Sequence, residues 1–193
     1  MRLTLAALVI VAATFVAAPS LAHEPDEQAQ LAAQARTRAT LRPHHRWLGL
    51  TTWISLGATI LLGTFRYANV IGFGTPLCDG GSPILGRTWG CGDGLMVQHG
   101  ISAGFTTLSY ASTRTLAALM PDPYDAAAHT PRLRAHRALS WVHLVGMIAM
   151  PVLGIATASS VDPDTRRILA TTHLIVGYST FAAVTTAGAL MVF

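Results

Sequence analysis

Residues 136–159 read HRALSWVHLVGMIAMPVLGIATAS, and this stretch decides the fold class of the chain. It contains an apolar run from Val142 to Ala158 in which His143 is the one ionisable residue. With its flanks, the run reaches the roughly 20 residues that a helix needs to cross a bilayer core. An ionisable ring in such a helix is costly, and it usually faces the interior of a bundle and marks a functional site. We therefore predict a transmembrane helix with one functional face.

At helical spacing, the histidines of this stretch share a face with small and sulfur-containing residues. This inward face consists of His136, Ser140, His143, Gly146, Met147, Met150, Gly154 and Thr157. The Met residues are expected to fill the core, because Met is more often a packing residue than a ligand. Three further apolar segments also turn a His and several small residues to one face, so the pattern is shared by the whole chain.

The composition fits a small membrane protein. Of the 193 residues, 51% are hydrophobic and 11% are charged, whereas soluble domains carry about 25% charged residues. All thirteen basic residues are Arg, and they lie in short loops and at helix ends, as interfacial anchors do. No basic run alternates with aromatic residues, so the sequence does not indicate nucleic-acid binding.

The N-terminus has the pattern of an export signal. Arg2 precedes an apolar segment, and small residues precede a cleavage point after Ala22. Residues 1–22 are therefore predicted to be a cleavable signal peptide, with an uncleaved anchor helix as the alternative. Either one places residues 23–42 outside the cytoplasm. This Ala- and Arg-rich segment is predicted to be a short amphipathic arm at the membrane interface or against a partner, or else a solvated tail.

Residues 43–193 are predicted to form an all-α, up-down-up-down four-helix transmembrane bundle. The apolar segments cover residues 47–65, 95–119, 138–158 and 168–193, and Pro43 is expected in the first turn of the first helix. Gly-, Pro- and Asp-rich connections are short, so consecutive helices are antiparallel neighbours. The first and third helices are then diagonal, as are the second and fourth. We expect a multi-pass protein of a bacterial-type inner membrane.

An internal repeat relates the two halves of the bundle. Residues 45–63 match residues 136–154, with HRWLG against HRALS at the start and Leu-Gly against Leu-Gly at the end. The second and fourth helices match more loosely around His99 and His173, and the alignment needs a one-residue slip. The chain is therefore interpreted as two related helical hairpins.

Depth in the membrane sorts the histidines into facing sets. His99 and His173 enter their helices from one side, whereas His45, His136 and His143 enter from the other. Two imidazoles on diagonal helices at one level provide the axial ligands of a haem, and small residues beside them leave room for the macrocycle. We predict that His99 and His173 hold one haem and that His45 and His143 hold another. The repeat favours His136 as the partner of His45, but burial favours His143, and burial decides the prediction.

Any such haem would be bound without a covalent link. Neither Cys78 nor Cys91 begins a C-x-x-C-H motif, so haem b is predicted, as two groups or as one. Arg46 and Arg137 each follow a His at the membrane edge and could pair with haem propionates as charge-assisted donors. The alternative for each is a snorkelling anchor.

This placement of His45, His99, His143 or His136, and His173 in four helices resembles the cytochrome b561-type membrane cytochromes. The resemblance covers residues 44–193 and is architectural, because no long motif carries it. It implies two b haems, one near each membrane face, and transmembrane electron transfer from a quinol or another small reductant, or to and from a redox protein. The chain would then be an electron-transfer protein or an oxidoreductase subunit, with or without partner subunits.

Several alternatives stay open. The histidines could be packing residues of a cofactor-free anchor or assembly subunit. Residues 100–104 match G-x-S-x-G, so an intramembrane serine hydrolase using Ser102 and His173 is a further hypothesis, although the motif lies in a helix without a preceding strand. Other metals usually add Cys or carboxylate ligands, which these helices lack. His23 would become the mature N-terminal residue and could bind copper, and His44 and His129 are expected at the interface or in a loop.

The two cysteines lie in one Gly-rich loop, residues 66–94. They are expected to form a disulfide in an oxidising compartment and to stay unpaired in the cytoplasm. The export signal places this loop in the cytoplasm, whereas the distribution of Arg favours the opposite orientation. We follow the export signal, which places residues 66–94 in the cytoplasm, but the sequence does not settle the orientation.

Overall fold

The computed structural model describes residues 27–122 and 129–192, so the predicted signal peptide and His23 lie outside the described residues. Four long helices dominate the described part: α1 (Glu27–Val70), α3 (Asp93–Leu119), α4 (Pro131–Ser159) and α5 (Pro163–Val192). Two short elements, α2 (Leu77–Gly80) and the π-helical turn η1 (Arg87–Cys91), interrupt the connection between α1 and α3. The described residues contain no strand, which confirms the all-α prediction.

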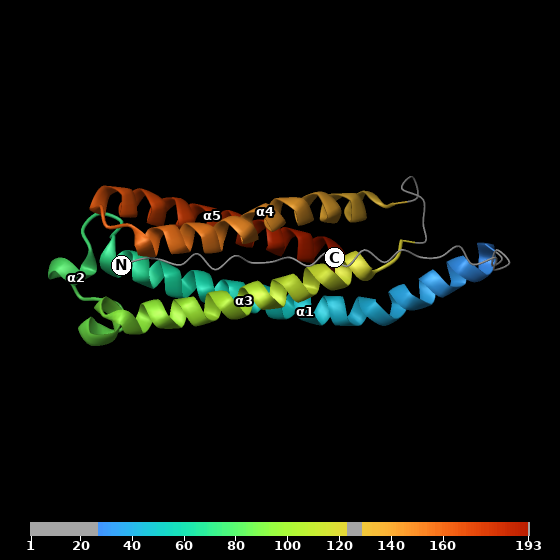
Figure 1. The fold of residues 1–193 in the computed structure, drawn as a ribbon, viewed down its shortest axis with the longest axis horizontal. Helices are drawn as coiled ribbons and strands as arrows, with labels where there is room; N and C mark the ends of the chain where they lie inside the picture. Colours follow the sequence, from blue (N-terminus) through green and yellow to red (C-terminus); the bar gives the residue numbers. More distant parts are fainter. Residues whose placement is uncertain (1–26, 123–128, 193) are drawn as a thin grey trace, which may run out of the picture.

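The long helices form two antiparallel hairpins, α1 with α3 and α4 with α5, that lie one above the other (Figure 1). Backbone contact between the hairpins runs mainly through α1 and α5. The α1–α3 and α4–α5 connections lie together at one end of the molecule, which we call the disulfide end (residues 66–94 and 159–167). The opposite end, made by residues 27–46, 114–122 and 129–141, is the arginine end.

Length and composition show which helices suit a membrane. α1, α4 and α5 each contain a stretch that is long and apolar enough to cross one, as expected of a multi-pass membrane protein. α3 has 27 residues but is less apolar, because Ser and Thr residues line one side of it. A fourth transmembrane helix therefore stays a prediction.

The exposed and buried residues are distributed as in a membrane protein. The outward faces of the helices carry large apolar side chains, such as Leu108 and Ile155, each 71% exposed. Among the buried side chains, hydroxyl groups are frequent: Thr52, Ser55, Thr59, Thr106, Ser109 and Thr180. In water this arrangement would be unfavourable, but in lipid the hydroxyls hydrogen-bond between helices while apolar groups face the acyl chains.

Hydroxyl pairs join α1 to α3. Thr52 Oγ1 lies 2.9 Å from Ser109 Oγ, and Thr59 Oγ1 lies 2.7 Å from Ser102 Oγ and 3.0 Å from Thr106 Oγ1. Each of these Thr hydroxyls also donates a hydrogen bond to a carbonyl one turn earlier in α1, Thr52 to Leu48 and Thr59 to Ser55. A row of hydroxyl groups therefore runs along the α1–α3 interface.

The hairpins meet in an apolar core near the middle of the molecule. Leu56 of α1, Tyr110 of α3, and Met147 and Met150 of α4 are buried in one cluster. The prediction that the Met residues fill the core is therefore confirmed.

The first helix differs from the prediction. Instead of starting at Pro43 after a separate arm, α1 runs from Glu27 to Val70 with Pro43 inside it. A proline in a helix removes one backbone hydrogen bond and crowds the preceding turn, so other contacts must favour continuity. One of them is the hydrogen bond that Arg38 Nη1 donates to the carbonyl of Pro121 at 2.9 Å. The start of α1 extends past the other helices at the arginine end (Figure 1).

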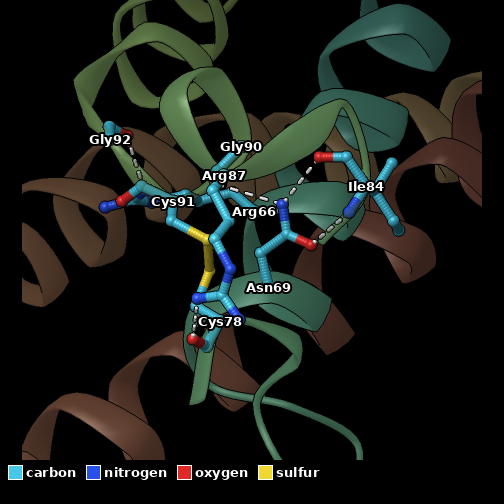
Figure 2. The surroundings of a disulfide bond; sticks show 8 residues. All are labelled: Arg66, Asn69, Cys78, Ile84, Arg87, Gly90, Cys91 and Gly92. Carbon is cyan, nitrogen blue, oxygen red and sulfur yellow. Dashed lines mark hydrogen bonds between the residues drawn. A yellow bond between two sulfur atoms is a disulfide. The ribbon is translucent and has the colours of Figure 1, made fainter. Parts of the chain in front are cut away.

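The connection at the disulfide end is a folded cap (Figure 2). Cys78 and Cys91 form a disulfide, the first of the two alternatives expected from the sequence. The fully buried Asn69 side chain donates to the carbonyls of Ile84 and Gly90 at 3.0 Å and accepts from the Ile84 N–H at 2.9 Å. One side chain at the end of α1 therefore satisfies three backbone groups of the cap.

Candidate functional site

The structure brings together the two histidines predicted to share a haem. His99 of α3 and His173 of α5 lie on diagonal helices, with ring centroids 6.1 Å apart and ring planes at 86°. Both rings are half-buried. They face each other across the interior of the bundle and not towards the surrounding lipid.

The backbone of the neighbouring helix fixes the His99 ring through Nδ1 and lies near Nδ1 of His173. His99 Nδ1 donates to the carbonyl of Thr59 at 3.0 Å. His173 Nδ1 is buried and faces the carbonyl of Met150, although the two groups fall short of hydrogen-bonding geometry. A metal-bound histidine usually donates its second ring N–H to such an acceptor, which sets the tautomer and the ring orientation. In both rings Nε2 is then the nitrogen left for a ligand.

A glycine lies against each ring. A Cβ atom at Gly63 would lie 2.8 Å from His99 Cε1, closer than any ordinary contact, whereas one at Gly154 would lie 3.4 Å from His173 Cε1. The two glycines occupy matching positions of the internal repeat. Gly63 is therefore required for the position of His99, whereas Gly154 leaves slightly more room.

Both rings line a cavity of about 290 Å³ that opens towards the disulfide end. This volume is at the lower limit of the roughly 300–1,000 Å³ typical of ligand pockets. Apart from the histidines, its polar lining comes from a few side chains: Thr59, Arg66, Tyr67, Thr157 and Arg166. The rest is apolar or glycine. The sequence analysis missed Arg66 and Arg166, because a single Arg at a helix end has the pattern of an ordinary anchor.

A second pair repeats this pattern at the other end of the helices. His45 Nδ1 donates to the carbonyl of Thr113 at 3.1 Å, and His136 Nδ1 donates to the carbonyl of Ala187 at 2.9 Å. Both rings are half-buried. In each case the acceptor belongs to the other helix of the same hairpin.

His143 has different surroundings. Its Nδ1 lies 2.8 Å from the hydroxyl of Tyr110, and the two rings pack at right angles with centroids 5.5 Å apart. It is therefore held by a side chain of α3, whereas Nδ1 of each of the other four faces a backbone carbonyl.

The histidines and the backbone groups that they face follow one register in all four helices. Within each helix, one histidine and one carbonyl group facing a histidine are separated by fourteen residues: His45 and Thr59, His99 and Thr113, His136 and Met150, His173 and Ala187. These contacts relate α1 to α4 and α3 to α5 without the slip that the sequence alignment introduced. Gly104, the residue that made the slip necessary, has open space around it. It therefore carries no information on the register.

The two arginines that the sequence assigned to propionates lie at the arginine end, each next to a histidine of the second pair. Arg46 is exposed at the arginine end. Arg137 contacts the carboxylate of Asp122, and its Nη1 lies 3.3 Å from His129 Nδ1. Asp122 also lies 2.8 Å from His129 Nε2, so this buried loop histidine packs between Asp122 and Arg137.

Two alternatives from the sequence concerned Ser102 and a metal site. Ser102 lies inside α3 and hydrogen-bonds to Thr59, and the described residues provide no group of three or more His, Cys, Asp or Glu that could hold a metal ion. His44 is exposed on α1. Comparisons with protein-family models, curated proteins and solved structures gave no match. Function is therefore inferred from the residues themselves.

Proposed function

We propose that this chain is a membrane-embedded b-type cytochrome that carries electrons between the two ends of its helix bundle. His99 and His173 would hold one haem at the disulfide end, and His45 and His136 a second at the arginine end. The observation that carries the proposal is the spacing and orientation of the His99 and His173 rings.

That spacing matches two axial ligands on one metal. An imidazole nitrogen lies about 2.0–2.1 Å from a bound metal, and the ring centroid lies roughly 1.1 Å further away, so two axial imidazoles place their centroids about 6.3 Å apart. The observed distance is 6.1 Å, with perpendicular ring planes. Edge-to-face packing of two rings also allows this distance, as between Tyr110 and His143 at 5.5 Å. The proposal therefore relies on the spacing together with the diagonal placement of the two helices and the cavity that both rings line.

The number of protein ligands favours haem over a bare metal ion. Structural zinc and copper sites draw three or four ligands from the protein. Here the described residues offer two imidazoles in a largely apolar cavity. A haem brings its own four equatorial nitrogens and needs only two axial ligands.

For the second haem we propose His136 in place of the His143 that burial favoured. His45 and His136 occupy equivalent places in the fourteen-residue register. His143 lies seven residues further along α4, about 10 Å deeper in the membrane, so it is level with neither pair. It also has its own partner in Tyr110.

A bound haem supplies a one-electron redox couple. The chain's own residues orient the imidazoles through backbone carbonyls, keep water out of the bundle with the apolar core, and set the two sites at opposite ends. A quinol or a redox protein at either membrane face would serve as the electron donor or acceptor.

For the orientation, we propose that the disulfide end faces the oxidising side of an inner membrane. Disulfides persist outside the cytoplasm, and Cys78 is bonded to Cys91. Between residues 27 and 193, eight Arg lie towards the arginine end and four at the disulfide end, as the positive-inside rule requires for a cytoplasmic arginine end. This orientation is opposite to the one implied by a cleaved export signal.

The haem assignment is tested by a reduced-minus-oxidised spectrum and a pyridine haemochrome count on purified protein. We expect two haems b per chain, and one each after His99→Ala, His173→Ala, His45→Ala or His136→Ala. His143→Ala is the matched control and should keep both. Colourless protein from haem-replete cells would contradict the proposal and favour a cofactor-free anchor. Loss of haem with His143→Ala but not His136→Ala would reverse the second pair.

The orientation is tested by labelling intact cells. In the Cys91→Ser variant, Cys78 is unpaired and should react with a membrane-impermeant maleimide added outside. Reaction only after the membrane is permeabilised would place the disulfide end in the cytoplasm.

A further inference from the structure

The cavity between His99 and His173 carries positive charge without an acidic partner in its lining. Arg66 of α1 and Arg166 of α5 both line it, and its lining contains no Asp or Glu. Within the described residues, neither guanidinium lies within 4 Å of a carboxylate, since all ion pairs of that length involve Asp122. Arg66 is half-buried beside this mostly apolar cavity, and Asp93 of α3 acts on it only from beyond 4 Å, so an anion in the cavity would stabilise its charge. Arg166 is exposed and adds a second positive charge at the same end.

The fold holds Arg66 in position. Its Nη1 donates to the carbonyl of Gly92 at 2.9 Å and approaches that of Cys91 at 3.3 Å (Figure 2). Because Arg has five N–H groups, these contacts with the disulfide cap leave others for a ligand. The cap is in turn fixed by the Cys78–Cys91 disulfide.

Arg166 is fixed in a similar way from the other hairpin. Its Nε and Nη2 donate to the carbonyl of Ser160 at 3.0 and 2.6 Å, which anchors the side chain at the start of α5. The neighbouring Arg167 is also exposed at this end but does not line the cavity. Arg166 therefore differs from Arg167 in that its side chain lines the cavity.

Both arginines lie on the same side of the histidine level. Arg66 is three residues beyond Gly63, which packs on His99, and Arg166 is seven residues before His173. At 1.5 Å per residue these separations are about 4.5 and 10 Å towards the disulfide end. A flat group centred between the imidazoles and extending towards the cavity mouth would bring its edge to the two guanidinium groups.

We propose that Arg66 and Arg166 form a two-carboxylate subsite that binds the propionates of the haem held by His99 and His173. This proposal rests on the proposed function. It concerns the disulfide end, whereas Arg46 and Arg137, the propionate partners expected from the sequence, lie beside His45 and His136 at the arginine end. Guanidinium groups bind carboxylates through charge-assisted, often bidentate hydrogen bonds, which would fix the rotation of the macrocycle about the axis between the imidazoles.

The test compares haem with haem dimethyl ester, in which both carboxylates are blocked, on full-length protein purified from haem-depleted cells. Dissociation rates are measured for each ligand, using the His45→Ala variant so that only the site at His99 and His173 is loaded. We expect haem to leave roughly tenfold or more slowly than the ester, because hydrogen bonds to charged groups are lost. Arg66→Gln and Arg166→Gln should each reduce this preference, and the double variant should abolish it.

Arg167→Gln is the matched control and should keep the preference. The ratio of haem to ester dissociation rates is taken within each variant, so a general loss of stability does not change it. If the Gln variants fold poorly, Arg66→Lys and Arg166→Lys replace them, because Lys keeps the positive charge. Equal rates for haem and ester in the parent protein, with a normal Soret band, would overturn the subsite and leave the cytochrome proposal intact. Absence of any Soret band would overturn both.

Discussion

Substituting Gly63 by Ala should damage the His99 site, whereas the equivalent Gly154→Ala should not. The added Cβ at residue 63 would lie 2.8 Å from His99 Cε1 and 3.2 Å from Nδ1, whereas at residue 154 the nearest atom is His173 Cε1 at 3.4 Å. The His99 ring must therefore move by roughly half an ångström, about the tolerance of a preorganised site. The His173 ring needs almost no adjustment.

The cost of that movement follows from what holds the ring. His99 Nδ1 donates to the carbonyl of Thr59 at 3.0 Å. Weakening this hydrogen bond costs about 0.5–1.5 kcal/mol, and an off-rotamer side chain costs about as much again. Together they amount to about 1–3 kcal/mol, which is roughly 5- to 150-fold weaker haem retention. Ala in place of Gly inside a helix adds about 0.5–1 kcal/mol of stability in both variants, so global unfolding is not expected to cause the loss.

The assay measures haem dissociation and thermal unfolding of both variants in detergent. We expect Gly63→Ala to release one haem 5- to 150-fold faster, and Gly154→Ala to release haem at the parent rate and to unfold at a slightly higher temperature than the parent protein. If Gly63→Ala kept both haems at the parent rate, or if Gly154→Ala were the more damaging change, the assignment of His99 as a fixed axial ligand would be refuted.

Three further predictions address the cap, the central histidine and the start of α5. Asn69→Ala removes three hydrogen bonds to the cap and should lower the free energy of unfolding by about 1–3 kcal/mol, measured by chemical denaturation; an unchanged midpoint would contradict the role of this side chain. Tyr110→Phe should leave the haem count unchanged, because the hydroxyl contacts His143 and not a proposed ligand; loss of a haem would identify His143 as a ligand. The pKa of Asp162 is lowered by hydrogen bonds from Thr165, so its contribution to stability is present above the ordinary carboxyl pKa of about 4 and is lost as pH falls through the lowered value. The melting temperature should therefore fall more steeply below about pH 4 in the parent than in Asp162→Asn, and parallel curves would contradict this.

Much of the helical architecture and one of the two histidine pairs could be predicted from the sequence. Apolar runs and helical spacing identify long helices and their inward faces, so the all-α fold and the proximity of His99 and His173 follow. They do not give the vertical register between helices. For that reason the sequence could not decide between His136 and His143, which lie two turns apart on the same face of α4.

The parts that escaped prediction depend on contacts between distant segments. Arg66 has the pattern of a snorkelling anchor until the loop carbonyls that hold it are known. Asn69 has the pattern of a helix-end residue until it is seen to bind Ile84 and Gly90. The residues that bind Arg66 and Asn69 lie 15 to 26 positions further along the chain. The hydropathy pattern contains no information on such contacts.

The fourteen-residue register also sets the distance that an electron would travel. At 1.5 Å per residue, fourteen residues correspond to about 21 Å along the bundle, and each of the four helices gives the same separation between the two histidine levels. A bilayer core is roughly 30 Å thick, so each pair would lie about 5 Å inside one face of the core. Under the proposed function, haems held at these two levels would divide the crossing into a short step at each face and one internal step. The buried cluster of Leu56, Tyr110 and Met147 packs between these levels and excludes water from the internal step. Moving one ligand to His143 would bring that haem to mid-membrane and leave the arginine end without a site near its surface, so an electron partner on that side could not reach it.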